Sequence, residues 1–297
     1  MLSQHQPIHG ACMMILAAIC FAIINSLVQY TNMTWHVHST TVAFYQYGFA
    51  LCFLLPWLLV HADKKLWQTE RLVLHVIRVL FAVIGLQFWL WALAYPVPIW
   101  QAIAMLMLSP IFSTIGSKLV LGEQVGYSRW LATLLGFLGA LLILEPWTAH
   151  FYWATLLPVC AAFFWSCCSM TVKKLSKTEN TITLILYLLV MTTPFNVAIA
   201  LPHWQVPHHM LVWIFLASAG LLTALAQFAL VRAYTVADAS FVQPFDHVKL
   251  PLNVIVSFLV LGTVPPGRLW LGASIIIGSV VYITHYEQYK RKRLSRQ

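Results

Sequence analysis

Ten apolar stretches, each about as long as a bilayer is thick, constrain this 297-residue chain more than any other feature. A helix needs ~17–25 mainly apolar residues to cross the hydrocarbon core. Because unpaired backbone groups are costly in lipid, a series of such stretches can fold only as membrane-spanning helices. The predicted spans are 9–31, 39–60, 74–95, 99–120, 128–146, 152–171, 181–201, 210–232, 237–261 and 268–286. The fold class is therefore predicted to be all-α and integral to the membrane.

Composition and charge support this prediction. Hydrophobic residues make up 61% of the chain and charged residues only 8%, whereas a soluble domain carries about 25% charged residues. The net charge of +9 is not a nucleic-acid-binding face, because five of the seventeen Lys and Arg residues lie in the tail and most others in short connections. The six cysteines all lie in apolar runs and are interpreted as small buried hydrophobes.

The break between the third and fourth stretches is the least obvious one. The segment YPVPI at 95–99 contains two prolines, which mark either a turn or a kink. A single helix from 74 to 120 is too long for one crossing, so we predict a turn.

The basic residues give the orientation. Cytoplasmic connections of membrane proteins carry an excess of Lys and Arg. Placing both termini in the cytoplasm puts the basic tail and nearly all other basic residues inside, Arg78 at the inner end of the third helix among them, and leaves only Arg268 outside. We predict a multi-pass membrane protein with both termini cytoplasmic.

The outer connections are rich in histidine. His36, His38, His208 and His209 are either solvated loop residues or ligands of a metal ion. Metal-ligand spacings normally come with a defined scaffold, and none is evident here. The sequence predicts no metal site and no cofactor.

The stretch 238–261 is the most unusual of the ten. It carries Asp246, His247 and Lys249 at its middle, between two prolines. A charge at the centre of a spanning helix costs at least ~2.5–3.5 kcal/mol, so such residues usually face the protein interior and serve a function. Proline removes a backbone donor, and the freed carbonyls are tolerated where they line a cavity. We predict a broken helix that holds a polar cargo or a proton.

The roles of these polar residues have alternatives. Asp246 and Lys249 are three positions apart and share one helix face, so they form either a structural pair or a substrate or proton site. His247 either relays protons or is a satisfied polar residue. Gln243 lies one turn before Asp246 and shares its face.

Other candidate substrate-binding residues lie at mid-depth on other helices. Trp89 on the third helix and Trp165 on the sixth can stack on a planar or cationic cargo, although such rings are more often part of the core packing. Gln87, Asn25 and Gln227 are polar residues that either contact the cargo or bond neighbouring helices.

The two halves of the chain repeat each other. Residues 119–143 (LVLGEQVGYSRWLATLLGFLGALLI) match 259–283 (LVLGTVPPGRLWLGASIIIGSVVYI) at aligned Leu-Gly and Trp-Leu pairs. With five helices in each half, the second half enters the membrane inverted, which is a common signature of secondary transporters. The predicted divisions are a first repeat at 1–146, an inverted second repeat at 147–286 and a basic cytoplasmic tail at 287–297.

Several motifs carry a family resemblance over essentially the whole chain. Arg78, ALAYPVP (92–98), SPIF (109–112) and LGE (121–123) make the sequence resemble the EamA family of the drug/metabolite transporter superfamily. The resemblance implies a ten-helix inverted repeat that transports small organic molecules, and the closest group contains carriers of S-adenosylmethionine. One departure is Thr263, where the family commonly has an acid matching Glu123. Glu123 itself is interpreted as a structural corner salt-bridged to Lys118 and Arg129, with a coupling carboxylate as the alternative.

The predicted function is secondary transport of a small polar metabolite by alternating access. A zwitterion, amino-acid-like or S-adenosylmethionine-like, suits paired charges at Asp246 and Lys249. Alternatives are a drug or lipid exporter, a flippase or a non-transporting membrane partner. An enzyme is not predicted, since no HExxH or nucleotide-binding motif occurs. The expected partners are the bilayer, the metabolite and a proton or counter-substrate, with no nucleic acid and an open oligomeric state.

Overall fold

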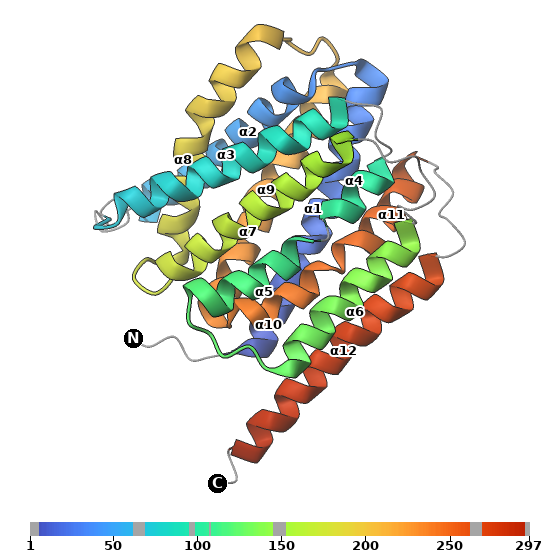
Figure 1. The fold of residues 1–297 in the computed structure, drawn as a ribbon. Helices are drawn as coiled ribbons and strands as arrows, with labels where there is room; N and C mark the ends of the chain where they lie inside the picture. Colours follow the sequence, from blue (N-terminus) through green and yellow to red (C-terminus); the bar gives the residue numbers. More distant parts are fainter. Residues whose placement is uncertain are drawn as a thin grey trace.

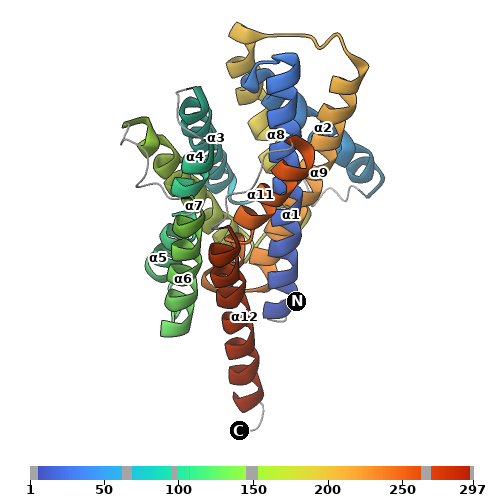
Figure 2. The ribbon, with the colours of Figure 1, turned by 90° about the vertical axis from the view of Figure 1, so that its right-hand side faces the viewer.

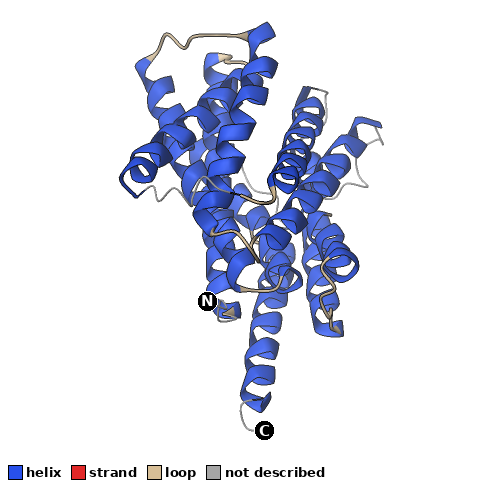
Figure 3. Ribbon diagram, turned by 90° about the vertical axis from the view of Figure 1, so that its left-hand side faces the viewer, coloured by secondary structure: helices blue, strands red, loops and turns tan. Residues whose placement is uncertain are grey.

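A computed structural model describes residues 6–61, 69–94, 99–106, 108–144, 153–261 and 269–294. Within these residues the chain forms twelve α-helices and no strand (Figure 3). Most of the turn predicted at 95–99 lies outside the described residues, as does Thr263.

The helices follow the predicted spans closely. The first half contains α1 (Pro7–Trp35), α2 (Ser39–His61), α3 (Leu72–Ala94), α4 (Ile99–Leu106), α5 (Ser109–Val120) and α6 (Tyr127–Leu144). The second half contains 3₁₀ helix η2 (Trp153–Leu156), α7 (Leu157–Leu175), α8 (Thr181–Ala200), 3₁₀ helix η3 (Leu201–His203), α9 (Met210–Val236), α10 (Ala239–Asp246), α11 (Lys249–Leu261) and α12 (Leu269–Leu294). Because α4 with α5 and α10 with α11 each form one broken span, the twelve helices make ten spans.

The two broken spans occupy equivalent places in the two halves. The ninth span is broken at His247–Val248, as the sequence predicts, and α11 has Pro251 in its first turn. The fourth span, predicted as one continuous helix over 99–120, is also broken, and α5 starts with Pro110 in its first turn. The physical reason is the same in both, because proline lacks a backbone donor and disfavours helical geometry in the residue before it.

The packing of the helices reflects the inverted repeat. The first span of each half packs on the third span of the other, so that α1 contacts α9 and α7 contacts α3. The second spans of the two halves, α2 and α8, pack together, and so do the fifth spans, α6 and α12. Exchanging the halves leaves this pattern unchanged. The fold is therefore an all-helical membrane architecture of two inverted five-helix repeats (Figure 1).

The outer surface suits lipid. Leu119, Leu259 and Leu271 are 76%, 73% and 68% exposed in the isolated chain. Large apolar side chains in such numbers on a surface mark contact with other apolar material, here the hydrocarbon of a bilayer. Among the described segments, four are individually long and apolar enough to cross a membrane: Pro7–Asn32, Leu72–Trp89, Thr181–His203 and Met210–Val236.

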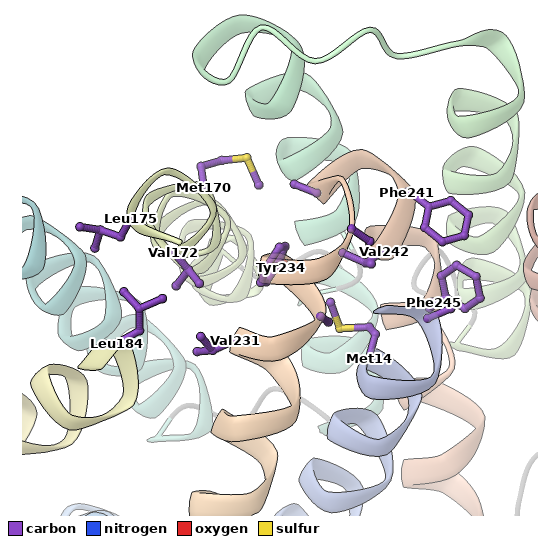
Figure 4. Close-up of a cluster of buried hydrophobic side chains, with 14 of the residues drawn as sticks. Met14, Met170, Val172, Leu175, Leu184, Val231, Tyr234, Phe241, Val242 and Phe245 are labelled. Atoms are coloured by element: carbon purple, nitrogen blue, oxygen red, sulfur yellow. The ribbon is translucent and has the colours of Figure 1, made fainter. Parts of the chain in front are cut away.

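The largest buried apolar cluster joins the two halves. Met14 of α1, Met170 of α7, Tyr234 of α9, and Phe241 and Phe245 of α10 all belong to it (Figure 4). Each of these side chains is at most 5% exposed. This cluster lies toward the end of the bundle that carries both chain termini, here called the basal end (Figures 1 and 2). At that end α12 continues as helix through the basic residues to Leu294.

At the opposite, distal end, the connection between α1 and α2 contacts the connection between α8 and α9. The His38 and His203 rings stack with centroids 4.2 Å apart, and the His38 backbone N–H donates to Gln205 at 3.0 Å. The structure thus pairs His38 with His203 and not with the other loop histidines. Within the described residues no group of three His, Cys, Asp or Glu side chains is arranged for a metal ion.

We expect this distal contact to weaken in acid. Partial burial, followed by the charge of His203, lowers the pKa of His38 below its ordinary 6.5. The undocked loop therefore binds a proton more readily than the docked one, so docking is favoured above pH ~6.5 and weakens as the pH falls below it. Hydrogen exchange of the loop amides between pH 7.5 and 5 checks this. A His38→Asn variant is the control, and equal protection of the wild type at both pH values would contradict the expectation.

Candidate functional site

A cavity lies between the two repeats at the broken spans. Its volume is about 220 Å³, and helices of both repeats line it. Seven of the nine predicted site residues are among the lining residues: Asn25, Trp89, Trp165, Gln227, Gln243, Asp246 and Lys249. Many small-molecule pockets are ~300–1,000 Å³, so this cavity is smaller than a typical binding pocket.

The predicted charge pair forms across the break of the ninth span. Asp246 ends α10, Lys249 begins α11, and the Lys249 Nζ lies 2.5 Å from Asp246 Oδ1. The two side chains are 12% and 23% exposed, so water screens the pair only partly. The Lys249 ammonium also lies 4.9 Å from the centre of the Phe21 ring of α1. The two charges therefore pair by distance, although the angles at Asp246 Oδ1 are not those of a hydrogen bond.

One wall of the cavity is aromatic. The Trp89 and Trp165 rings lie 6.2 Å apart at an angle of 46°, and Trp165 Nε1 donates to the Ala82 carbonyl at 3.4 Å. Trp165 reaches α3 only because residue 85 is glycine, since a Cβ there would lie 2.6 Å from the Trp165 ring. The rings present broad faces on which a planar cargo can stack.

Amide side chains contribute polar groups to the same cavity. Asn25 of α1 donates to Asn253 of α11 at 2.9 Å, and Asn253 in turn donates to the Lys249 carbonyl at 2.7 Å. Gln243 donates to the hydroxyl of Tyr234. The bond between Asn25 and Asn253 connects the first repeat to the broken span of the second, and the other two bonds lie within the second repeat. Asn25 is thus both a lining residue and a bond between helices.

Two predicted site residues lie elsewhere. The His247 side chain is fully buried, and its Nε2 lies 3.1 Å from the Thr133 carbonyl of α6. It occupies a notch at Gly136, where a Cβ would lie 2.3 Å from the His247 ring. Gln87 does not line the cavity, and its Nε2 is buried without a partner.

Arg78 is the principal lining residue that the sequence interpretation missed. It was assigned to the inner end of the third helix, but it lies in the second turn of α3, is 1% exposed and lines the cavity. Its position is four, eight and eleven residues before Ala82, Leu86 and Trp89, which line the cavity too. This one-face spacing was the available signal. Other lining residues not predicted are Phe21, Tyr47, Cys168, Ser169, Thr192, Tyr234 and Asn253.

The basal side of the site is closed by contacts between the repeats. The Glu123 carboxylate accepts hydrogen bonds from the backbone N–H groups of Ala239 and Ser240, both at 3.0 Å, and from the Ser240 hydroxyl at 2.8 Å. These N–H groups belong to the first turn of α10, which has no side-chain cap of its own. Gly122 has a φ of 67°, a left-handed conformation that glycine adopts without strain. It turns the chain between the end of α5 and Glu123.

A second pair of charges supports the same junction. Arg129 of α6 donates to Asp238 at 3.1 Å and to the Ser240 hydroxyl at 2.6 Å. Lys173 of α7 donates to the Tyr234 carbonyl at 2.8 Å at the end of α9. Glu123 therefore bonds to the start of α10 of the other repeat, whereas the sequence interpretation expects a salt bridge to Lys118 and Arg129.

Replacing Glu123 with glutamine should destabilise the protein and slow transport. Glutamine keeps one acceptor oxygen and no charge, so at least one charge-assisted bond to α10 is lost, at a cost of about 1–2 kcal/mol. Thermal unfolding and a transport assay measure the two effects. Glu70→Gln, at an exposed glutamate, is the matched control. A Glu123→Gln protein as stable and active as the wild type would refute the role of the cap.

Two inverted repeats that enclose a mid-span cavity with a charged pair and broken helices define a membrane transporter. Comparison with known proteins agrees with this class. A model of the EamA-like transporter family matches residues 8–145 and 152–285, and the chain belongs to this family. The predicted resemblance is thereby confirmed, and the protein is a multi-pass bacterial membrane protein.

Three relatives and one solved structure describe the neighbourhood of this chain. A riboflavin transporter of Vibrio cholerae is 55% identical over 98% of this chain and 97% of the relative. A riboflavin transporter of Rhizobium johnstonii is 44% identical over 96% and 93%. An S-adenosylmethionine uptake transporter of Rickettsia prowazekii is 25% identical over 95% and 94%. A solved crystal structure shares the fold, with a TM-score of 0.73 and 17% identity, over 92% of this chain and 98% of the other.

All three relatives are transporters of small molecules, in agreement with the prediction that this chain is a transporter and not an enzyme.

Proposed function

We propose that this protein transports riboflavin across the bacterial inner membrane by alternating access. The main support is the similarity to transporters of that name, at 55% and 44% identity over nearly the whole chain. Similarity to an S-adenosylmethionine carrier is much lower, at 25%. The proposal replaces the zwitterionic cargo favoured by the sequence interpretation.

The chemistry of the cavity favours a flat neutral molecule. Riboflavin has a planar three-ring system and a polyhydroxylated ribityl chain. Trp89 and Trp165 supply aromatic faces for the ring system, and Asn25, Asn253 and Gln227 supply amides for hydroxyl groups.

The charges of the cavity disfavour a cationic cargo. Among the described lining residues, Arg78 and Lys249 are cationic and only Asp246 is anionic, which leaves one excess positive charge. S-adenosylmethionine carries a sulfonium and an ammonium against one carboxylate, so it is repelled on balance. A zwitterion would also have to separate the closed Asp246–Lys249 pair.

Both termini are assigned to the cytoplasm in this proposal, because the basic tail and the basic connections then lie inside. The contacts at Glu123 then close the cytoplasmic side of the cavity.

The test is uptake of radiolabelled riboflavin by liposomes containing the purified protein, with S-adenosylmethionine and an amino-acid mixture as competitors. We expect saturable riboflavin movement that the competitors do not inhibit. Trp165→Ala should remove it, whereas Trp91→Ala, at a tryptophan of α3 that is 56% exposed and outside the cavity lining, should not. Movement of S-adenosylmethionine without movement of riboflavin would reject the proposal in favour of the original interpretation.

A further inference from the structure

Arg78 is a buried cation whose hydrogen-bonding capacity is only partly used. One guanidinium nitrogen donates to the Leu184 carbonyl at 2.7 Å, and the Cys168 thiol is hydrogen-bonded to the same group. The Nε atom is buried and has no partner. In the part of the chain that the structure describes, no carboxylate lies within ion-pairing distance of this side chain. A buried charge without a counter-charge is destabilising, so its presence in a cavity points to a ligand.

The position of Arg78 relative to the aromatic wall limits what that ligand can be. Trp165 Nε1 bonds to the carbonyl of Ala82, one helical turn from Arg78 along α3, and the Trp165 ring covers Gly85. At 1.5 Å per residue, positions 82 and 85 lie only ~6–11 Å along the helix from position 78. A flat ring system stacked on Trp165 therefore has one end within reach of the Arg78 side chain.

A second unused polar group lies on α8, the helix whose carbonyl holds Arg78. The Thr192 side chain of α8 is 2% exposed and lines the cavity, and its hydroxyl has no hydrogen-bond partner. It lies on the same helix as Leu184, whose carbonyl holds Arg78. Two unsatisfied polar groups on one side of a mainly apolar cavity suit a heterocycle with a polar edge better than a lipid tail.

The flavin ring system has such an edge at one end only. Its pyrimidinedione ring presents two carbonyl oxygens and an acceptor nitrogen, whereas the other end is an apolar dimethylbenzene. Arginine offers planar, forked donors that match a carbonyl beside a ring nitrogen. A positive charge near this part of a flavin is also a means by which proteins tune the ring electronically.

Resting on the proposed function, we propose that Arg78 binds the pyrimidinedione end of the flavin ring and so determines the direction in which the ring lies in the cavity. The dimethylbenzene end then points away from Arg78 toward Trp89 and the apolar residues Ile103 and Leu106 of α4. The ribityl hydroxyls are left for the polar groups across the cavity on α10 and α11.

The first experiment measures flavin binding to the purified protein by quenching of flavin fluorescence and by the shift of the flavin absorption bands. Arg78→Met should bind riboflavin about tenfold more weakly or worse, as expected for the loss of one charge-assisted hydrogen bond, and should lose the absorption shift. Arg78→Lys keeps a charge near the Leu184 carbonyl, so its affinity for riboflavin should lie between those of the wild type and Arg78→Met. Arg71→Met, at an exposed arginine just before α3, is the matched control and should bind as the wild type does.

The second experiment changes the ligand, and its first comparison uses the wild-type protein alone. In 2-thioriboflavin a weak sulfur acceptor replaces the C2 carbonyl oxygen. Wild-type protein should bind 2-thioriboflavin several-fold more weakly than riboflavin, and Arg78→Met should bind the two ligands equally well. In a thermodynamic cycle that combines a change in the protein with a change in the ligand, this result indicates a direct contact. Equal loss in both proteins would overturn the contact.

The remaining outcomes separate this proposal from the proposed function. If the wild type and Arg78→Met bind and transport riboflavin equally well, the role of Arg78 is rejected and riboflavin transport stands. If the wild type prefers flavin mononucleotide to riboflavin and Arg78→Met removes that preference, Arg78 binds the phosphate and the ring-edge proposal is wrong. If the wild type binds neither flavin, both proposals fail together.

Discussion

Asp246→Asn should abolish transport and destabilise the protein, because it leaves Lys249 buried beside an apolar ring without its counter-charge. Breaking a buried ion pair by removal of one partner costs about 3–5 kcal/mol, and partial exposure of this pair places the expected loss at the low end. Thermal unfolding of the purified protein and uptake in liposomes measure the two effects. An Asp246→Asn protein with unchanged unfolding temperature would contradict the importance of the pair.

A double variant separates structure from transport at the same pair. Removing both charges with Asp246→Asn and Lys249→Met should restore most of the lost stability, since an uncharged pair leaves no buried charge unpaired. If uptake returns along with stability, the pair is structural, whereas stability without uptake indicates that the charges take part in transport. This experiment decides between the two readings that the sequence leaves open.

Gly85→Ala should weaken cargo binding by about tenfold or more, because the new Cβ occupies the space of the Trp165 ring. The ring must turn away from α3 and give up its bond to the Ala82 carbonyl. Overpacking of this kind costs about 1–3 kcal/mol, partly offset by the ~1 kcal/mol by which alanine favours a helix over glycine. Stability should therefore change little while binding falls sharply.

Flavin-fluorescence quenching and thermal unfolding on the same samples test this. Gly48→Ala is the matched control, since a Cβ at Gly48 would meet no atom within 4 Å. Binding by Gly85→Ala that equals binding by Gly48→Ala would show that Trp165 is not part of the site.

Most of the fold could be predicted because membrane constraints act locally. Apolar length alone placed the spans, and an odd number of helices per repeat required the inversion. Two prolines around Asp246 indicated the break in the ninth span. Pro110 indicates a break in the fourth span in the same way. No charged residue lies beside it, however, so the sequence alone favours one continuous helix there.

Site residues could be predicted only where their position at the middle of a membrane span is by itself unusual. Asp246, Lys249 and Trp165 are unusual at mid-span whatever surrounds them, and they line the cavity. Arg78 was missed because basic residues are common at the cytoplasmic ends of membrane helices, so its position near the start of α3 did not indicate a binding role. The sequence places His247 in the site together with Asp246 and Lys249. The space beside Gly136 of α6 that holds the His247 ring exists only after the repeats have packed, so the sequence could not indicate it.

The cap that Glu123 provides also makes the two ends of the molecule unequal. The matching position in the sequence of the second repeat is Thr263, so the repeat does not carry a second carboxylate at this position. Two identical repeats would have given two access states of equal free energy. Here the basal end is held by charge-assisted bonds, and a difference of 1.4 kcal/mol already changes a population ratio tenfold. We therefore expect the resting molecule to favour the state that is shut at its own termini, before any cargo or ion gradient acts on it.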